Sequence, residues 1–557
     1  MNKIVIIGGG AAGPKVALKA KREHPDLDVV LITEEEYTSY SGCGLPYYIG
    51  GVINGTESVI IKSPEQLRKE FGLRVFTGCR VEKIEYNENT VKVWDLIQNK
   101  DFSIVYDRLV IATGASPVIP NFLRYKAKNL FTLRSVYDGF KIKEYINNNN
   151  VHHISIIGGS FIGLELAENI KKLGKQVSII ELSEQLLPSF DQDFGDIIKN
   201  VVIENGVNVF IDESATGFEF SEDKKLIKSI ITNKRTIAAD LIVLSVGVSP
   251  NTDFINPDKV NLNENGTIII DKKFKTSYEN IYAVGDCAEN YNLNINKKSW
   301  LPMGSTANKA GRVCGINISN EDCSIEFPGV AGTIVFKLFS IGVGKTGLSE
   351  KDAINADIDY ECVTIGARNV PKHFPGSDFD VIKLIARKSD RKILGIQAFG
   401  KGPIDKYVDT VVTAMKFGAT VEDLQYLDLS YSPLFGTPIS AINLSANVLD
   451  NKMNGVFNTI SSKELYEIMN NTNVQIIDVR SEEEYAISHI PNSKNIEYLE
   501  LIKSNEKIDR NSHICLVCDT VKRTYIALRY LDYYGYSDIK VLDGGLLMWP
   551  YQKASLY

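Results

Sequence analysis

The sequence lacks the features that would tie the chain to a membrane or to nucleic acid. No apolar run is long enough to span a bilayer. Acidic residues outnumber basic ones by 69 to 62, which gives a net charge of −7, so a basic surface for nucleic acid is not indicated. The apolar run from Ile4 to Ile7 is too short for the core of a signal peptide. We interpret it as a first strand and expect a cytoplasmic protein.

Paired cysteines are also scarce. Of the eight cysteines, only Cys515 and Cys518 are three residues apart. On an extended strand such residues point to opposite faces about 10 Å apart, too far for a disulfide, so Cys515 is predicted to be a buried strand residue. We expect reduced thiols rather than a disulfide framework, and no bound metal.

Cys43 has no cysteine near it in the sequence, because the next is Cys79. A single thiol can form a mixed disulfide or a persulfide with a partner molecule, or cycle through a sulfenic acid. It cannot close an internal disulfide with a near neighbour. This restriction narrows the chemistry that Cys43 can carry out.

A first glycine loop follows the Ile4–Ile7 strand. It is succeeded by helical sequence to about His24 and by a second strand over Val29–Ile32. Strand, glycine turn, helix and strand is the order of a dinucleotide-binding unit, in which glycines let the backbone approach a pyrophosphate. An acid after the second strand would bind the ribose. The candidate residues of this site are Gly8, Gly10, Ala11, Gly13 and Glu34.

A second glycine loop follows the strand Ile154–Ile157 and repeats the pattern, with serine in place of the middle glycine. Glu181 lies 23 residues after Gly158, where an acid accepts from a ribose 2′-hydroxyl and repels a 2′-phosphate. NADH is therefore favoured over NADPH. The alternative is one nucleotide site beside an unrelated repeat. The candidates here are Gly158, Ser160, Phe161, Gly163 and Glu181.

Further strand ends carry Thr113-Gly114, Gly247 and Gly285-Asp286. Together with the two loops, this order resembles the flavoprotein pyridine nucleotide-disulfide oxidoreductases. The resemblance implies that the first loop binds FAD, that Asp286 contacts its ribityl-phosphate chain, and that the second loop binds NAD(P)H. It makes Phe161 the gate over the flavin, the alternative being a packed core aromatic. The residues that it adds to the cofactor sites are Thr113, Gly114, Gly247, Asp286 and Ala307, the last in a segment that borders the flavin.

Cys43 and the Gly44-Leu45-Pro46-Tyr47-Tyr48 that follows it resemble the single-cysteine branch of this family. That branch holds coenzyme A-disulfide reductases, NADH oxidases and NADH peroxidases. Ala11 stands where the peroxidases and water-forming oxidases carry a histidine, so a thiol or sulfane-sulfur substrate is favoured. Tyr431 matches one of two tyrosines that the reductases bring from the partner subunit. The second is missing near His373, which is a replacement proton donor or a surface histidine.

Coenzyme A would need cations for its phosphates. Lys19 and Arg22 lie on the first predicted helix, in the region that matches the family's coenzyme A contacts. The alternative is a solvated helix face. The resemblance also implies a homodimer.

The last hundred residues resemble a rhodanese domain. A strand over Ile514–Val517 ends at Cys518, and a helix follows. The resemblance implies a persulfide on Cys518 and makes Arg523 the loop arginine. Val521 stands where the loop usually has glycine, so an inactive structural module is the alternative.

These observations predict an α/β protein with two Rossmann-like nucleotide-binding domains, an α+β dimerisation domain and a C-terminal α/β rhodanese domain. The FAD-binding domain is predicted in two parts, 1–118 and 249–322, around an NADH-binding domain, 119–248. The dimerisation and rhodanese domains are predicted over 323–452 and 456–557.

The functional hypothesis is an FAD-dependent NADH oxidoreductase. It would reduce coenzyme A disulfide, coenzyme A persulfide or polysulfide through Cys43, coupled to a sulfurtransferase whose catalytic residues include Cys518 and Arg523. Tyr431 would assist Cys43. The alternatives are an NADH oxidase that reduces oxygen at the flavin, and a redox sensor with a non-catalytic rhodanese module.

Overall fold

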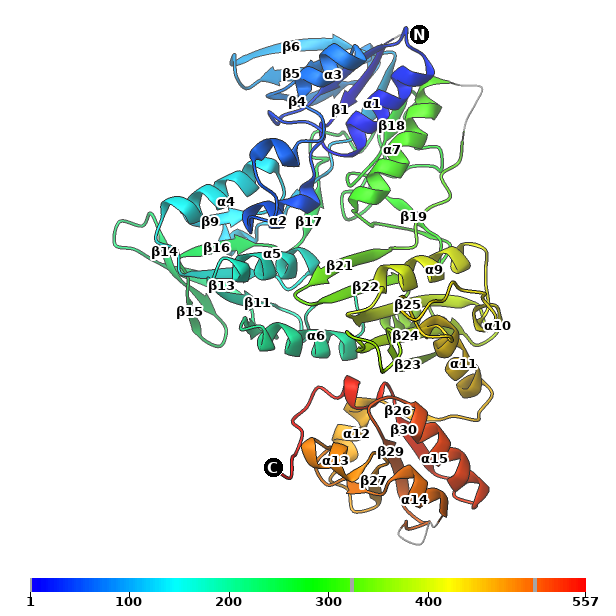
Figure 1. Ribbon diagram of the computed structural model, residues 1–557. Helices are drawn as coiled ribbons and strands as arrows, with labels where there is room; N and C mark the ends of the chain where they lie inside the picture. Colours follow the sequence, from blue (N-terminus) through cyan, green and yellow to red (C-terminus); the bar gives the residue numbers. More distant parts are fainter. Residues whose placement is uncertain (1–2, 321–324, 504–507) are drawn as a thin grey trace. The chain divides into compact units, whose positions relative to one another are not determined.

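The computed structural model describes residues 3–320, 325–503 and 508–557. These divide into two compact units (Figure 1). The first comprises the chain up to Glu184 together with Gly206–Val330, and the second comprises Gln185–Asn205 and Ala331–Tyr557.

The first unit contains a parallel five-stranded sheet in the order β18-β7-β1-β2-β3. Four of the five residues of β1 are buried, as expected for a parallel strand that is covered on both faces. Helices α1 and α7 pack closely, because a Cβ on Gly311 of α7 would lie 2.9 Å from the Ala12 carbonyl oxygen. The strands are β1 (Lys3–Ile7), β2 (Asp28–Ile32), β3 (Arg74–Phe76), β7 (Arg108–Ile111) and β18 (Ile281–Ala283); the helices are α1 (Ala12–Glu23), α2 (Leu45–Ile49), α3 (Pro64–Phe71) and α7 (Gly304–Ser319).

A second parallel five-stranded sheet of the first unit has the order β12-β11-β10-β16-β9. Strand β10 repeats the burial pattern of β1. The elements are β9 (Leu130–Thr132), β10 (His153–Ile157), β11 (Gln176–Ile180), β12 (Asn208–Phe210), β16 (Leu241–Leu244), α4 (Val136–Asn148) and α5 (Phe161–Lys172).

Smaller antiparallel sheets complete the first unit. They are formed by β4 (Cys79–Glu85), β5 (Thr90–Asp95) and β6 (Lys100–Val105); by β13 (Ala215–Phe220), β14 (Ile227–Thr232) and β15 (Thr236–Ala238); by β8 (Ala115–Pro117) and β17 (Val248–Pro250); and by β19 (Asn290–Asn292) and β20 (Lys297–Ser299).

The second unit begins with α6 (Gln192–Glu204) and contains an antiparallel five-stranded sheet in the order β21-β22-β25-β24-β23. The apolar side chains of β23–β25 share one core with helices α9 and α11. The elements are β21 (Ile334–Leu338), β22 (Ile341–Gly347), β23 (Tyr360–Arg368), β24 (Phe379–Arg387), β25 (Ile393–Gly400), α8 (Glu350–Asn355), α9 (Ile404–Lys416), α10 (Val421–Gln425) and α11 (Ala441–Met453).

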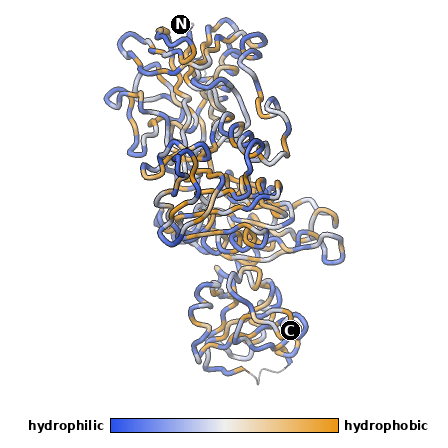
Figure 2. The backbone as a smooth tube through the Cα atoms, turned by 90° about the vertical axis from the view of Figure 1, so that its left-hand side faces the viewer, coloured by the Kyte–Doolittle hydropathy of each residue, from blue (hydrophilic) through white to orange (hydrophobic). Residues whose placement is uncertain are grey.

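The chain ends in a parallel five-stranded sheet in the order β26-β30-β29-β27-β28. Its elements are β26 (Thr459–Ile460), β27 (Val474–Asp478), β28 (Lys494–Asn495), β29 (His513–Val517), β30 (Ile539–Leu542), α12 (Ser462–Ile468), α13 (Glu482–Ile487), α14 (Tyr498–Lys503) and α15 (Lys522–Tyr533). Hydrophobic and hydrophilic stretches alternate along the described part of the backbone (Figure 2). The predicted α/β class is confirmed.

Candidate functional site

The first glycine loop joins β1 to the start of α1. Gly8 has a φ of +120°, and a Cβ there would lie 2.1 Å from the Ala112 carbonyl oxygen. A Cβ on Gly13 would lie 1.9 Å from the Gly8 carbonyl oxygen, so both positions require glycine for packing. A Cβ on Gly10 would meet no protein atom within 4 Å. The loop thus offers an open backbone face at the N-terminus of a twelve-residue helix, which fits a nucleotide phosphate.

The second loop repeats this geometry between β10 and α5. A Cβ on Gly158 would lie 2.1 Å from the Ser245 carbonyl oxygen, and one on Gly163 would lie 2.2 Å from the Gly158 carbonyl oxygen. Ser160 has a φ of −74°, so the backbone at this position does not require glycine. Phe161 begins α5 and is half-buried. Both loops therefore fit a dinucleotide.

The two predicted ribose-binding acids differ in their surroundings. Glu181 is buried, and its carboxylate accepts hydrogen bonds from the backbone N–H of Gly159 at 2.6 Å and of Ser183 at 2.8 Å. Glu34 is exposed and lies 3.5 Å from Arg80. The neighbouring Thr33 is buried instead. Glu181 is thus hydrogen-bonded to its loop, and the ribose-binding roles of both acids stay predictions.

Three strand ends meet at the first loop. The Thr113 hydroxyl donates to the Asn251 carbonyl at 2.7 Å, and the Asn251 N–H donates to the Gly114 carbonyl at 3.0 Å. A Cβ on Gly285 would lie 3.0 Å from the Ala12 Cβ and 4.0 Å from the Ala307 Cβ. The strand end before Asp286 therefore approaches both α1 and α7, which brings Asp286 and Ala307 to the first loop.

Gly114 and Gly247 adopt φ values of +69° and +111°, and a Cβ on either would meet nothing within 4 Å. Asp286 forms an ion pair with Arg134. The predicted residues of the first nucleotide site, apart from Glu34, thus lie at one edge of the first sheet, whereas Gly247 follows β16 of the second sheet.

Cys43 lies in the 3₁₀ turn Gly42–Gly44, directly before α2, and its side chain is exposed. Desolvation by the surrounding protein and the carboxylate of Glu165 raise the pKa of its thiol, while Arg134 lowers it. The turn therefore exposes a thiol to partner molecules and places it in the electrostatic field of groups from both nucleotide-binding sheets.

Sequence analysis missed an acid near Cys43. The Tyr47 hydroxyl donates to Glu165 Oε1 at 3.0 Å, and burial raises the pKa of Glu165 to about 7. Tyr47 follows Cys43 by four residues, and Glu165 follows Phe161 by four residues on the same face of α5. The only sequence signal was an acid one helical turn from the predicted gate.

The residues proposed for coenzyme A lie at the end of α1. Lys19 forms an ion pair with Glu23, and Arg22 is exposed. In the second unit, Tyr431 is 49% exposed, and His373 is exposed beside Phe374 with 4.8 Å between the ring centroids. Their roles stay predictions.

Cys518 lies between β29 and α15 and is 1% exposed. Its Sγ contacts the Thr520 carbonyl and lies 3.7 Å from the Thr524 hydroxyl. Burial raises the pKa of this thiol, while hydrogen bonds with Thr524 and the charge of Arg523 lower it. Val521 has a φ of −99°, so the backbone at this position does not require glycine. Cys515 is buried on β29, as predicted.

Models of known families match three parts of the chain. Residues 2–310 match the pyridine nucleotide-disulphide oxidoreductases, and residues 333–439 match the dimerisation domain of that family. The chain belongs to the pyridine nucleotide-disulphide oxidoreductases. Residues 461–550 match the rhodanese-like domain. Both predicted resemblances are confirmed.

Curated relatives share this oxidoreductase part. The NAD(P)H sulfur oxidoreductase (CoA-dependent) of Pyrococcus abyssi is 34% identical over 80% of this chain and 98% of its own length. The NADH oxidase of Methanocaldococcus jannaschii is 29% identical over 79% of this chain and 96% of its own.

Two solved structures extend over the rhodanese-like part as well. Reduced Bacillus anthracis CoADR-RHD and an NAD-dependent persulfide reductase from A. fulgidus are each 32% identical to this chain, with a TM-score of 0.92. Each covers 98% of this chain, and the matches cover 97% and 100% of those chains. The oxidoreductase and rhodanese parts are thus similar to both in one continuous chain.

Within its second unit, the oxidoreductase packs the loop around Cys518 against strand β23. A Cβ on Gly366 would lie 2.9 Å from Thr520 Cγ2. The Thr364 N–H donates to Asp543 Oδ1 at 3.0 Å, and the Gly544 N–H donates to the Thr364 carbonyl at 2.9 Å. Burial raises the pKa of Asp543 to about 6.

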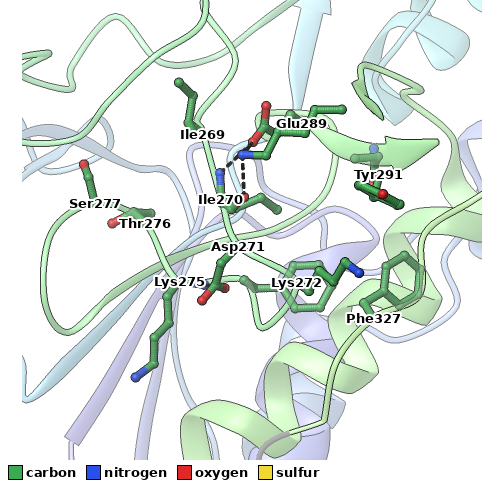
Figure 3. A pocket seen from close by; sticks show the side chains of 13 residues that line it. Ile269, Ile270, Asp271, Lys272, Lys275, Thr276, Ser277, Glu289, Tyr291 and Phe327 are labelled. Carbon is green, nitrogen blue, oxygen red and sulfur yellow. Dashed lines mark hydrogen bonds and ion pairs between the residues drawn. The ribbon is translucent and has the colours of Figure 1, made fainter. Parts of the chain in front are cut away.

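A separate cavity of about 490 Å³ lies in the first unit (Figure 3). Apolar side chains such as Phe327 line it together with Lys272, and the buried Glu289 is paired with Lys298. None of the predicted site residues lines this cavity.

No described helix is both long and apolar enough to cross a membrane. Within the described ranges, no three His, Cys, Asp or Glu residues are grouped as metal ligands.

Proposed function

We propose that this oxidoreductase uses FAD and NADH to reduce coenzyme A disulfide, coenzyme A persulfide or polysulfide at Cys43, and that Cys518 transfers sulfane sulfur. The observation that carries the proposal is the exposed thiol of Cys43. Charged groups that lie beside both glycine-loop sheets influence its pKa. FAD would be held by Gly8, Gly10, Gly13 and Asp286, and NADH by the second loop. NADH would supply the two electrons of the reduction, and FAD would relay them.

Cys43 would act as the nucleophile. Its thiolate attacks one sulfur of a disulfide R–S–S–R′, forming a Cys43–S–S–R bond and releasing R′–S⁻. Two electrons and one proton then return Cys43 to the thiolate and release R–SH. With a persulfide R–S–SH, the overall products are R–SH and H₂S.

The surroundings of Cys43 suit this chemistry. Because burial raises the pKa of Glu165 to about 7, this acid is a candidate proton donor near neutral pH. Tyr47 lies on the helix that follows Cys43, and its hydroxyl donates a hydrogen bond to Glu165. This hydrogen bond links the carboxyl group of Glu165 to that helix. The Ala11 side chain cannot donate a proton at the first loop. Sulfur is therefore favoured over peroxide as the electron acceptor.

The choice of sulfur carrier rests on relatives. Relatives from Pyrococcus are named as a CoA-dependent sulfur oxidoreductase and as a coenzyme A polysulfide/persulfide reductase. We propose that Lys19 and Arg22 bind the phosphates of coenzyme A. The buried Glu181 favours NADH, because a 2′-phosphate would meet its charge.

We propose a homodimer in which Tyr431 reaches Cys43 of the second copy. The matched dimerisation domain supports it, as do exposed apolar side chains around Tyr431, namely Leu434, Phe435 and Ile439. The five predicted domain ranges and a cytoplasmic location stay part of this proposal.

A second candidate function is an NADH oxidase that reduces oxygen at the flavin. Relatives from Methanocaldococcus jannaschii and Enterococcus faecalis, 29% and 28% identical, carry that name. In this reaction Cys43 would be secondary.

The test compares Cys43→Ser with wild type in NADH oxidation. Coenzyme A disulfide, coenzyme A persulfide and polysulfide are supplied without oxygen, and oxygen is supplied alone. Loss of more than about a hundredfold in kcat/KM for the sulfur acceptors, with flavin retained, is expected. Cys79→Ser is the matched control, because Cys79 is buried in the same unit. Full sulfur reduction by Cys43→Ser would disprove the proposal, and oxygen turnover that exceeds sulfur turnover would favour the oxidase.

A further inference from the structure

The Cys518 loop is surrounded by a network of paired charges. Arg523 forms a bidentate ion pair with Glu484 of α13, its second nitrogen lying 3.0 Å from Oε1. The same nitrogen donates to Asp519 Oδ2 at 3.1 Å. Arg480 donates to Asp519 Oδ1 at 3.0 Å and also forms a bidentate pair with Asp478. Asp519, the residue directly after Cys518, thus bridges both arginines.

Asp519 therefore leaves little positive charge at the loop. The arginines Arg480 and Arg523 face three carboxylates, those of Asp478, Glu484 and Asp519. Lys553 is near enough to interact with Arg480 and Asp519, and it donates to the Leu546 carbonyl at 3.2 Å. Lys522 is exposed. Each of the two arginines near Cys518 is therefore paired with two acids.

This inference rests on the proposed sulfur transfer at Cys518. We infer that Asp519 makes Cys518 selective for sulfur carried on an organic thiol, as a persulfide, and a poor acceptor from thiosulfate. Asp519 acts as a positioning residue, through Arg480 and Arg523.

The chemistry of the two donors explains the selectivity. With a persulfide, the Cys518 thiolate attacks the outer sulfur of R–S–SH, giving Cys518–S–SH and R–S⁻. With thiosulfate, the same attack gives Cys518–S–S⁻ and sulfite, which departs with two negative charges. The sulfonate is bonded directly to the sulfur that is transferred, so its charge must approach the loop. A thiol carrier can keep its charged groups many bonds away.

Burial strengthens the discrimination. Cys518 is 1% exposed, and its loop packs against Gly366 of β23, so only the outer atom of a donor can reach the thiol. At such a site an unneutralised arginine would be needed to stabilise departing sulfite. Asp478, Glu484 and Asp519 pair with both arginines that could serve this purpose.

The experiment measures cyanide-coupled sulfur transfer by the full-length protein with two donors, thiosulfate and glutathione persulfide. Wild type is expected to use the persulfide at least about a hundredfold better in kcat/KM. Asp519→Asn should raise kcat/KM for thiosulfate about tenfold, the equivalent of about 1.4 kcal/mol, and change the persulfide value less than about twofold. Asp532→Asn is the matched control, because Asp532 pairs with Arg529 on the same helix at 3.2 Å.

The outcomes separate the two proposals. If neither donor leaves a Cys518-dependent persulfide, detected by intact mass against Cys518→Ser, sulfur transfer at Cys518 is wrong. If wild type uses both donors equally, or Asp519→Asn changes both equally, the selectivity inference is wrong while sulfur transfer stands. A general loss of structure would lower both rates together, so the ratio of the two donors reports the charge.

Discussion

Gly10 offers the sharpest test of the first nucleotide site. Its φ is not in the left-handed region, and a Cβ there would meet no protein atom within 4 Å. Gly10→Ala should therefore leave the fold intact, and loss of backbone freedom in the unfolded chain stabilises such a variant by roughly 0.4–1 kcal/mol. The added methyl group occupies the open face of the loop, where the pyrophosphate of FAD is proposed to lie.

The expected loss is one of affinity. A methyl group that displaces the pyrophosphate breaks one or two hydrogen bonds from backbone N–H groups to a charged ligand, each contributing about 1.5–3 kcal/mol. A total of about 3 kcal/mol corresponds to roughly a hundredfold weaker binding. Gly13→Ala should behave differently, because its Cβ would lie 1.9 Å from the Gly8 carbonyl oxygen. Overpacking of this kind destabilises a fold by about 1–3 kcal/mol or more.

The assay combines titration of the apoprotein with FAD, followed by flavin fluorescence, and thermal unfolding without added flavin. Gly217→Ala is the control, because Gly217 on β13 also has open space and no positive φ. Gly10→Ala should match this control in unfolding temperature and differ from it in FAD affinity. If Gly10→Ala bound FAD as tightly as wild type, the first loop would not be the FAD site.

Three further variants test other parts of the chain. Burial raises the pKa of Glu165 from 4.5 to about 7, so the folded state holds an extra proton between these values and stability falls as pH rises through them. Glu165→Gln should gain up to roughly 3 kcal/mol on wild type between pH 4 and 8; an unfolding-temperature difference that is the same at both pH values would contradict this. Glu181→Ser should lower the NADH-to-NADPH ratio of kcat/KM about tenfold, and an unchanged ratio would remove Glu181 from cofactor choice. Gly366→Val should weaken the contact with the Cys518 loop by about 1–3 kcal/mol, read as faster alkylation of Cys518; protection equal to that of wild type would show that β23 does not restrain the loop.

The sequence predicted those parts of the site that depend on neighbouring residues. Gly8 and Gly13 are constrained by contacts within one strand-turn-helix unit, so their pattern is visible in a few residues. The same holds for the position of Cys518 between a buried strand and a helix. These features are local, and both nucleotide loops have the geometry expected of them.

The pairing of Tyr47 with Glu165 was not predictable in the same way. The two residues are 118 positions apart, and only the packing of α2 against α5 brings them together. The contact between Thr364 and Asp543 spans 179 positions and joins two sheets. No periodicity encodes such contacts, because each partner is an ordinary polar residue in its own segment. Burial at the end of β2 was also not predictable. Sequence alone could not show that Thr33 is buried there and that Glu34 is exposed.

The two thiols differ in a way that bears on the proposed transfer of sulfur. Cys43 is exposed, whereas Cys518 is only 1% exposed. Desolvation raises the pKa of both thiols; Glu165 raises that of Cys43 further, whereas hydrogen bonds with Thr524 lower that of Cys518. The electrostatic surroundings of a leaving thiolate would therefore differ between the two sites. A small carrier that bears its reactive sulfur at the end of a long, flexible arm would suit both thiols, because its charged groups need not enter either site.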